Sequence, residues 1–344
     1  MDSFSAITAR MPALRAEITA HPERHRILTG ERPTGALHLG HLFGTILERV
    51  RLQQMGVETF VVVADYQVIT DRDSVGDIAT NVREVVRDNL AAGLDPERTT
   101  IFTHSAVPEL NQLLLPFLSL VSEAELHRNP TVKAEAAAAG RSLSGLLLTY
   151  PVHQAADILF CKGTLVPVGK DNLPHVEVAR QIARRFGERY GAVFPEPAGL
   201  ITTAPELPGL DGRKMSKSYG NAISLRMTAE ETAAVIRRSQ TDSERSITYE
   251  PDRRPGVSAL LDTAAVCLGR TPADVAEEIG NGGSGALKRL TATAVNDFLA
   301  EHRERRAAID PATVSEVLHD GNARAREIAA ATLAEVRAAM GMAY

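Results

Sequence analysis

Short apolar runs alternate with helical patterns through about the first 205 residues, and this alternation limits the possible folds more than any other feature. Helical periodicity lies between or after runs that predict buried strands. The predicted strands are 26–30, 58–65, 99–103 and 164–169, and the predicted helices are 39–55, 74–92 and 171–189. This order predicts an α/β fold with a Rossmann-like parallel sheet, whose ligands bind at the carboxyl ends of the strands.

The rest of the chain is predicted to be helical. Residues 108–162 predict a helical insertion between the third and fourth strands. Beyond the sheet the predicted helices are 229–238, 257–268, 272–279, 286–306 and 313–339. We therefore expect an N-terminal helix (1–25), a Rossmann-like domain (26–210), a loop (211–225) and a smaller all-helical C-terminal domain (226–344) that could hold an RNA or form a dimerisation bundle.

Composition excludes several classes of protein. The net charge of −5 argues against a chain that binds nucleic acid over its whole surface, so RNA contacts would need local basic patches. The candidate patches are 237–238, 253–254, 288–289 and 303–306, most of which we expect to be solvated helix faces. No apolar run is long enough to span a bilayer, and the two cysteines form neither a metal motif nor a disulfide framework. These features favour a cytoplasmic protein without a membrane partner.

The stretch 32–41, with the sequence RPTGALHLGH, follows directly after the first predicted strand. Its two histidines, His38 and His41, are three residues apart and fall on one face at the start of a helix. A helix start offers unpaired N–H groups and a positive dipole end, which favour phosphate, and Gly40 would let a flat base approach the backbone. The alternative is an ordinary pair of surface histidines.

A second stretch, KMSKS at 214–218, lies between Gly212 and Gly220. Lys214 and Lys217 are three positions apart, so two ammonium groups could close over a triphosphate if the flanking glycines let the loop move. The alternative is a solvated basic loop.

Tyr150, Gln154 and Asp157 fall on one stripe of a predicted helix, and Asp157 is embedded among alanines and aliphatic residues. Burying a carboxylate is costly without a partner. The partner could be structural, such as an arginine or backbone N–H groups. It could also be a ligand, because an indole nitrogen is a donor only and matches a fixed carboxylate.

HLGH and KMSKS together resemble the HIGH and KMSKS signatures of class I aminoacyl-tRNA synthetases. Residues 150–159, 165–177 and 254–261 resemble corresponding parts of the tryptophanyl-tRNA synthetases, and the similarity runs from about residue 26 to the end of the chain. The resemblance implies that ATP activates tryptophan and that the product acylates tryptophan tRNA. It also implies Mg²⁺ held by the ATP phosphates rather than by a protein metal site, and a homodimer.

The resemblance implies roles for individual residues. Those implied in catalysis are His38, His41, Lys133, Lys214 and Lys217. Those implied in ATP binding are Arg32, Pro33, Thr34, Gly40, His41, Gly169, Lys170, Asp171, Lys214, Met215, Ser216, Lys217 and Ser218. Those implied in tryptophan binding are Asp157, Tyr150, Gln154, Asn172, Leu28, Val166 and Val168. The chain departs from common bacterial members at Gln67, Lys170, Asn172 and Tyr219.

Three other functions fit parts of this pattern. A tyrosyl-tRNA synthetase could pair a buried aspartate with a phenol, but its archaeal type has tyrosine where this chain has Leu28. A small-molecule nucleotidyltransferase shares the histidine signature but needs neither the lysine loop nor a helical domain. A synthetase paralogue acting as a binding or regulatory protein would not need the histidines and lysines that both signatures retain.

Overall fold

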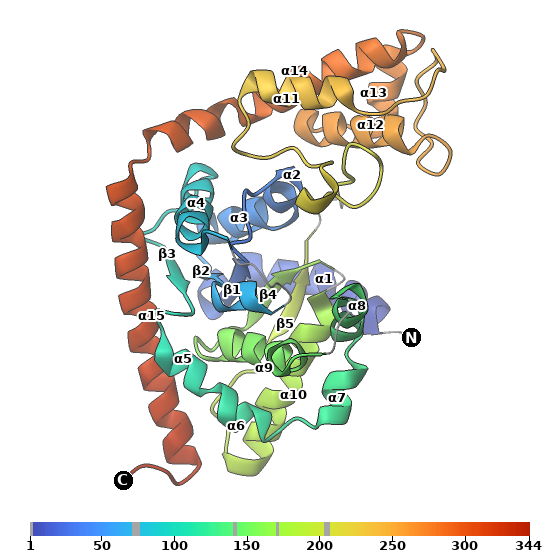
Figure 1. Cartoon of the computed structure of the whole chain (residues 1–344). Coiled ribbons are helices and arrows are strands. Elements are labelled where there is room, and N and C mark those ends of the chain that lie inside the picture. Colours follow the sequence, from blue (N-terminus) through green and yellow to red (C-terminus); the bar gives the residue numbers. More distant parts are fainter. Residues whose placement is uncertain (1–2, 71–75, 140–142, 170–171, 203–206) are drawn as a thin grey trace. The chain divides into compact units, whose positions relative to one another are not determined.

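The computed structural model describes residues 3–70, 76–139, 143–169, 172–202 and 207–344 (Figure 1). The chain forms two compact units. Unit 1 comprises residues 1–35, 48–203 and 310–344, and unit 2 comprises residues 36–47 and 204–309. No helix within the described ranges combines the length and the apolar character needed to cross a membrane.

Unit 1 contains a five-stranded, all-parallel sheet with the strand order β3-β2-β1-β4-β5. The strands are β1 (Arg26–Glu31), β2 (Glu58–Val63), β3 (Thr99–Thr103), β4 (Leu165–Val168) and β5 (Ala198–Ile201). The first four confirm the predicted strands. The sequence analysis missed β5, because this four-residue edge strand contains alanine and glycine and carries almost no strand signal.

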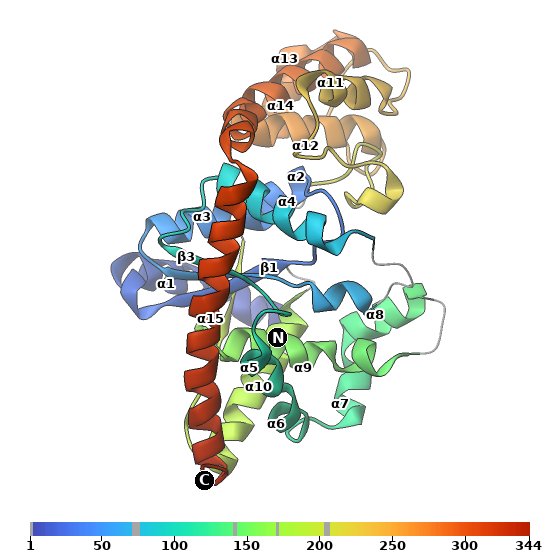
Figure 2. The same cartoon turned by 60° about the vertical axis from the view of Figure 1, so that its left-hand side comes forward.

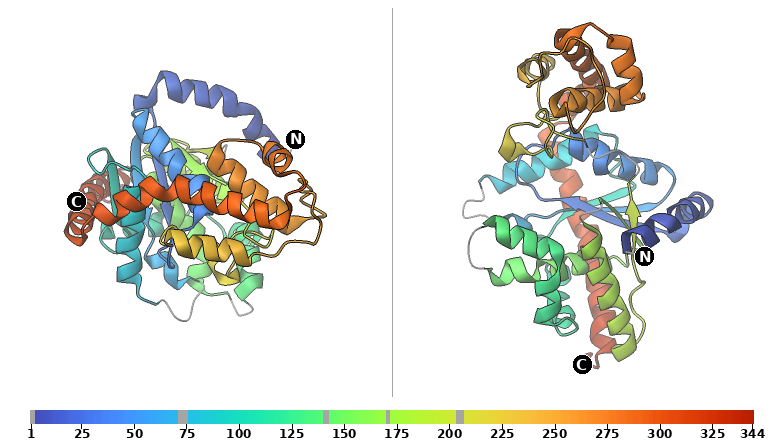
Figure 3. Two further views of the ribbon diagram at one scale, coloured as in Figure 1. Left: turned by 90° about the horizontal axis from the view of Figure 1, so that it is seen from above. Right: turned by 90° about the vertical axis from the view of Figure 1, so that its right-hand side faces the viewer.

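Both faces of the sheet carry helices, as expected for parallel strands (Figure 3). The helices of unit 1 are α1 (Ser3–Ala20), α3 (Leu47–Gln54), α4 (Ile78–Ala91), α5 (Pro108–Gln112), α6 (Leu114–Leu118), α7 (Glu123–Arg128), α8 (Pro130–Ala139), α9 (Gly145–Leu159), α10 (Leu173–Tyr190) and α15 (Pro311–Ala339). Unit 2 contains α2 (Leu39–His41), α11 (Ala229–Arg238), α12 (Pro255–Leu268), α13 (Pro272–Ile279) and α14 (Gly283–Ala308). Helices α5 to α9 occupy the predicted insertion.

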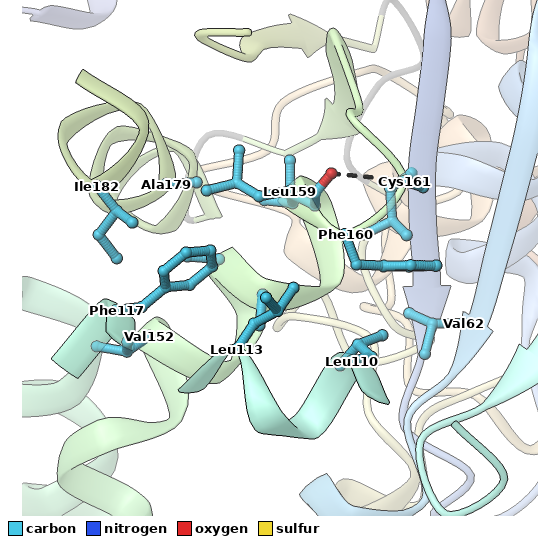
Figure 4. Close-up of a cluster of buried hydrophobic side chains, with 14 of the residues drawn as sticks. Val62, Leu110, Leu113, Phe117, Val152, Leu159, Phe160, Cys161, Ala179 and Ile182 are labelled. Atoms are coloured by element: carbon cyan, nitrogen blue, oxygen red, sulfur yellow. Dashed lines mark hydrogen bonds between the residues drawn. The ribbon is translucent and has the colours of Figure 1, made fainter. Parts of the chain in front are cut away.

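Successive residues of β1 and of β4 supply two separate hydrophobic cores, because side chains alternate between the faces of a sheet. Ile27 of β1 joins a small core with Leu52 of α3, whereas Leu28 joins the larger core on the other face. Phe160 in the larger core meets Phe60 and Phe102 edge-to-face, and Figure 4 shows it beside side chains of α5 and β2. The larger core therefore fixes α9 against the carboxyl half of the sheet.

Glu31, at the end of β1, forms a buried ion pair with Arg49 of α3. Arg49 is fully buried, and its Nη atoms also donate to Asn89 Oδ1 at 2.9 Å and to Thr29 Oγ1 at 3.1 Å. Only Nε of this guanidinium lacks a hydrogen-bond partner among the described residues. Because both oxygens of Glu31 accept from Arg49, which also donates to Asn89 and Thr29, the pair joins β1, α3 and α4 despite its desolvation cost.

Helix α15 belongs to unit 1, although the sequence analysis placed it in a C-terminal domain of 226–344. It runs along β3 and past α5 (Figure 2). Gly321 lies so close to β3 that a Cβ built on it would be 1.9 Å from the carbonyl oxygen of Ile101, and Asn322 Oδ1 accepts from the N–H of Thr103 at 2.9 Å. The helix therefore covers an edge strand of the sheet, a contact that local sequence pattern does not reveal.

Candidate active site

The HLGH segment belongs to unit 2, whereas the sequence analysis placed it in the sheet domain. His38 has extended backbone and forms an antiparallel bridge with Ser224, which positions the start of α2. The predicted continuous α-helix over 39–55 instead contains a π-helical turn, Leu42–Ile46, before α3. Phe43 of this turn stacks on Phe298 of α14 with ring centroids 4.8 Å apart. Packing within unit 2 therefore fixes the histidine segment.

His38 and His41 lie together, as their spacing predicted. Their ring centroids are 3.8 Å apart, and the backbone N–H of His38 donates to His41 Nδ1 at 3.2 Å. This contact assigns the ring hydrogen of a neutral His41 to Nε2, which is the atom that can donate to an anion. Burial, together with the charges of His41 and Lys217, lowers the pKa of His38 to about 3. His38 is therefore a neutral donor at physiological pH.

The lysine loop lies next to the histidine segment within unit 2. A Cβ built on Gly40 would be 3.6 Å from the sulfur of Met215, which is buried, and Lys217 is close enough to act on His38 electrostatically. Lys214 and Lys217 are exposed, and Lys217 begins a 3₁₀ turn, Lys217–Tyr219. The two signatures thus converge locally.

Two glycines set the shape of this loop. Gly212 and Gly220 have φ of +80° and +66°, values that side chains disfavour. A Cβ on Gly212 would also be 2.5 Å from Cβ of Pro255. The positive φ angles at both positions and the close approach at Gly212 explain why glycine flanks the lysine loop on both sides.

Asn221 organises the loop, and the sequence analysis did not single it out. Its Oδ1 accepts from the N–H of Ser216 at 2.8 Å, and its Nδ2 donates to the carbonyl of Lys214 at 3.1 Å and to Asp211 at 2.7 Å. A Cβ on Gly209 would be 2.2 Å from Asn221 Nδ2. The asparagine after the second glycine was the available signal.

The predicted amino-acid pocket lies in unit 1 on α9. Tyr150 and Asp157 are buried, and Gln154 is half-buried. The hydroxyl of Tyr150 is 3.2 Å from Nε2 of His175 on α10. The predicted apolar wall residues Leu28, Val166 and Val168 are 3%, 4% and 5% exposed and belong to the same core cluster as α9.

Asp157 has a partner that the sequence analysis did not foresee. Its Oδ1 is 2.9 Å from Nε2 of His104, a fully buried residue directly after β3. His153, one turn earlier on α9, lies beside His104 with ring centroids 4.5 Å apart and ring planes tilted by 54°. The three side chains offer donor atoms within 4.8 Å of one another, a spacing that a transition metal could also use. The available signal was a histidine at the carboxyl end of a strand.

The remaining predicted ATP residues divide between the two units. Arg32, Pro33 and Thr34 follow β1, and Gly169 follows β4, all in unit 1. Arg32 is 3.9 Å from Glu135 of α8, and Lys133 of the same helix is exposed. Asn172 is exposed at the N-cap of α10. Lys170, Asp171 and the side chain of Ser218 lie outside the part that the structure describes.

Most of the candidate basic patches are engaged within unit 2. Arg254 is buried and paired with Asp242, and Arg253 pairs with Glu244 and Glu250. Arg303 donates to the carbonyl of Met227 and to Thr232, while Lys288 donates to the carbonyls of Arg237 and Ser239. The side chains of Arg237 and Arg238 are exposed on α11. The structure therefore assigns stabilising roles to residues expected to be solvated.

Comparison with known proteins adds independent findings. The family model described as tRNA synthetases class I (W and Y) matches residues 21–300. The tryptophan–tRNA ligase of Thermotoga maritima is 40% identical over 328 residues, covering 93% of this chain and 100% of that protein. The Treponema pallidum tryptophan–tRNA ligase is 42% identical over 331 residues, covering 92% of this chain and 97% of its own.

A solved structure is similar over nearly the same extent. The tryptophanyl-tRNA synthetase of Campylobacter jejuni, complexed with ADP and tryptophan, has a TM-score of 0.80 and 29% sequence identity. The match covers 92% of this chain and 99% of that one.

Proposed function

The chain belongs to the class I tRNA synthetases of the tryptophan and tyrosine group, and we propose that it is an ATP-dependent tryptophan–tRNA ligase. Relatives with that name align with nearly the whole chain. The observation that carries the catalytic part of the proposal is the local convergence of the HLGH segment and the lysine loop. A solvated loop or a surface histidine pair would not require that convergence.

In the first proposed step, the tryptophan carboxylate attacks the α-phosphorus of ATP and pyrophosphate leaves. Negative charge on the phosphate oxygens is stabilised by donors that are already in place, so positioning and electrostatics supply the catalysis. Lys214 and Lys217 provide positive charge, and Nε2 of His41 provides a hydrogen-bond donor. His38 and Asn221 hold these groups in place, and Lys133 of unit 1 is the further cation that we propose acts on the phosphates.

Mg²⁺ fits this scheme as part of the ATP complex. It prefers oxygen ligands, whereas the HLGH segment and the loop supply imidazoles and ammonium groups. We therefore propose that the phosphates hold the ion, which adds positive charge to them. Arg32, Pro33, Thr34, Gly40, Met215, Ser216 and Gly169 are proposed to contact other parts of ATP, as are Lys170, Asp171 and Ser218 outside the described geometry.

Selection of tryptophan is proposed to depend on Asp157. An ionised carboxylate only accepts hydrogen bonds. It therefore favours the indole N–H over an isosteric ring that has no N–H group. Tyr150, Gln154 and Asn172 are proposed to hold the amino group. Leu28, Val166 and Val168 supply apolar contact, which rewards a large aromatic side chain.

In the second proposed step, the tryptophanyl adenylate transfers its acyl group to the terminal ribose of tryptophan tRNA. We propose that the helices of unit 2 contact the tRNA, with Arg237 and Arg238 the exposed cations of α11. We further propose a cytoplasmic homodimer, on the basis of the family alone.

The test is ATP–pyrophosphate exchange with each amino acid, followed by acylation of tryptophan tRNA. We expect exchange that depends on tryptophan, and exchange with tyrosine instead would contradict the proposal. Lys217→Ala should lower the exchange rate about 100- to 1,000-fold, as loss of a transition-state donor does. Its affinity for tryptophan should change little.

Lys162→Ala is the matched control, because Lys162 pairs with Glu335 within unit 1, whereas both signatures belong to unit 2. It should leave exchange unchanged. If Lys217→Ala lost exchange rate and tryptophan affinity to the same extent, the proposed transition-state role of Lys217 would be contradicted.

A further inference from the structure

We propose that His104 is a positioning residue for tryptophan selection: its ring holds one oxygen of Asp157, so that the other oxygen of the carboxylate faces the indole N–H. This inference rests on the proposed function. It adds a residue from a different element, since His104 follows β3 and Asp157 is on α9.

The surroundings of His104 indicate that its role is the contact with Asp157. It is fully buried, and neither ring nitrogen has a hydrogen-bond partner among the described residues. Its Nε2 lies 2.9 Å from Asp157 Oδ1, but the ring N–H is not aligned for a hydrogen bond. Buried polar atoms without hydrogen bonds cost free energy and are rare in native proteins. A histidine with only a packing role could be replaced by an apolar residue without that cost.

His153 is not the counter-ion of Asp157. Asn111 donates both amide hydrogens to the carbonyls of His104 and Val107, so its Oδ1 must accept from Nε2 of His153 at 2.8 Å. Burial lowers the pKa of His153, which outweighs the opposing effect of Asp157. His153 is therefore a neutral ring held by Asn111.

The charges around His104 favour its protonated form. Burial lowers its pKa, but the charge of Asp157, the close contact of that carboxylate with the ring and, to a smaller extent, the charge of Asp65 outweigh burial and raise the pKa above the ordinary 6.5. Asp65 itself accepts from the N–H groups of Tyr66 and Ser105 and from the Ser105 hydroxyl. The groups that face His104 are thus two carboxylates, the neutral His153 and the ring of Tyr66, whose centroid is 6.3 Å away.

The first test compares tryptophan with an analogue in which sulfur replaces the indole N–H, 3-(benzothiophen-3-yl)alanine. In His104→Phe, we expect the KM for tryptophan in ATP–pyrophosphate exchange to rise about tenfold, with kcat within about threefold, because a charge-assisted contact is lost. Discrimination between tryptophan and the analogue should fall by a similar factor. His104→Gln keeps a donor without the charge and should lie between wild type and His104→Phe.

His127→Gln is the matched control, because that histidine is exposed on α7 and pairs with Glu123. This variant should match the wild type in the KM for tryptophan, in kcat and in discrimination against the analogue. If the wild type shows no exchange that depends on tryptophan, the proposed function fails. If the wild type shows it and both His104 variants keep full discrimination, the proposed function stands and the positioning role is overturned.

The second test needs no folded variant of His104. As pH rises through its elevated pKa, the imidazolium loses its proton and Asp157 loses its counter-ion. The ratio of analogue KM to tryptophan KM in the wild type should therefore fall across that range, since the amino-group titration is common to both substrates. A ratio that does not fall at any pH above 6.5 at which the enzyme stays active would overturn the proposal. A loss of discrimination on adding EDTA would also overturn it, because it would instead assign the three side chains to a metal.

Discussion

Two buried carboxylates of unit 1, Glu31 and Asp157, have partners of different kinds. Glu31 is paired with Arg49, whose Nη atoms donate to a carboxylate, an amide and a hydroxyl. Asp157 is paired with His104, which has no hydrogen bond at either nitrogen among the described residues. Arginine cannot release its proton in a protein, whereas histidine titrates near physiological pH. The first pair is therefore permanent, and the second can respond to pH or to a ligand.

Substitution within the permanent pair should change stability most. Arg49→Met should destabilise the protein by about 3–5 kcal/mol, because it leaves Glu31 buried without its partner. Urea denaturation measures this change. The exposed Arg324, 3.3 Å from Glu58, provides the control Arg324→Met, which should cost less than about 1 kcal/mol. If the two variants were equally stable, the buried pair would not have the structural role assigned here.

Asp157→Asn should show the opposite pattern. Its free energy of unfolding should change by less than about 1 kcal/mol at pH 8, because His104 can release its proton when the carboxylate is removed. Discrimination between tryptophan and the sulfur analogue should fall about 10- to 100-fold, as expected when a charged acceptor is lost. Exchange assays and urea denaturation of one preparation measure both. A loss of stability as large as that of Arg49→Met would erase the contrast between the pairs.

Thr29→Val tests a single hydrogen bond of the permanent pair. It keeps the shape of the side chain but removes the oxygen that accepts from Arg49 Nη2. We expect a loss of about 1–2 kcal/mol in urea denaturation, because a buried donor loses a partner. Thr19→Val is the control, since Thr19 is exposed and bonds only within α1. A neutral Thr29→Val would show that the remaining bonds of Arg49 suffice.

The smallest predicted effect is a change in the pKa of a third buried polar group, His38 in unit 2. Its Nδ1 has no hydrogen-bond partner in the described parts, and its pKa is lowered to about 3. An anion beside it would favour the imidazolium, so pyrophosphate should raise its pKa by about one unit, equivalent to about 1.4 kcal/mol. Titration of the ring proton by NMR, with His38→Gln to assign the signal, measures the shift. An unchanged pKa at saturating pyrophosphate would place the anion elsewhere.

Features that depend on consecutive residues could be predicted from the sequence, whereas contacts between residues far apart in the sequence could not. The first four strands and the two signatures are local patterns, so their existence and spacing could be inferred from consecutive residues. The contact between Asp157 and His104 joins residues 53 positions apart through the larger core, and no local pattern encodes it. The same reason explains why α15 was predicted to be a helix but assigned to a separate domain. Asn221 differs, because it lies beside the loop that it holds and could have been noticed.

The position of α15 has a consequence for synthesis of the chain. This helix is translated after the whole of unit 2, yet it shields β3 of unit 1. A nascent chain that has emerged only as far as α14 therefore exposes the backbone of a sheet margin to other chains. Slow translation of α15 would prolong this exposure, and the intermediate would be prone to aggregate until Gly321 docks on β3.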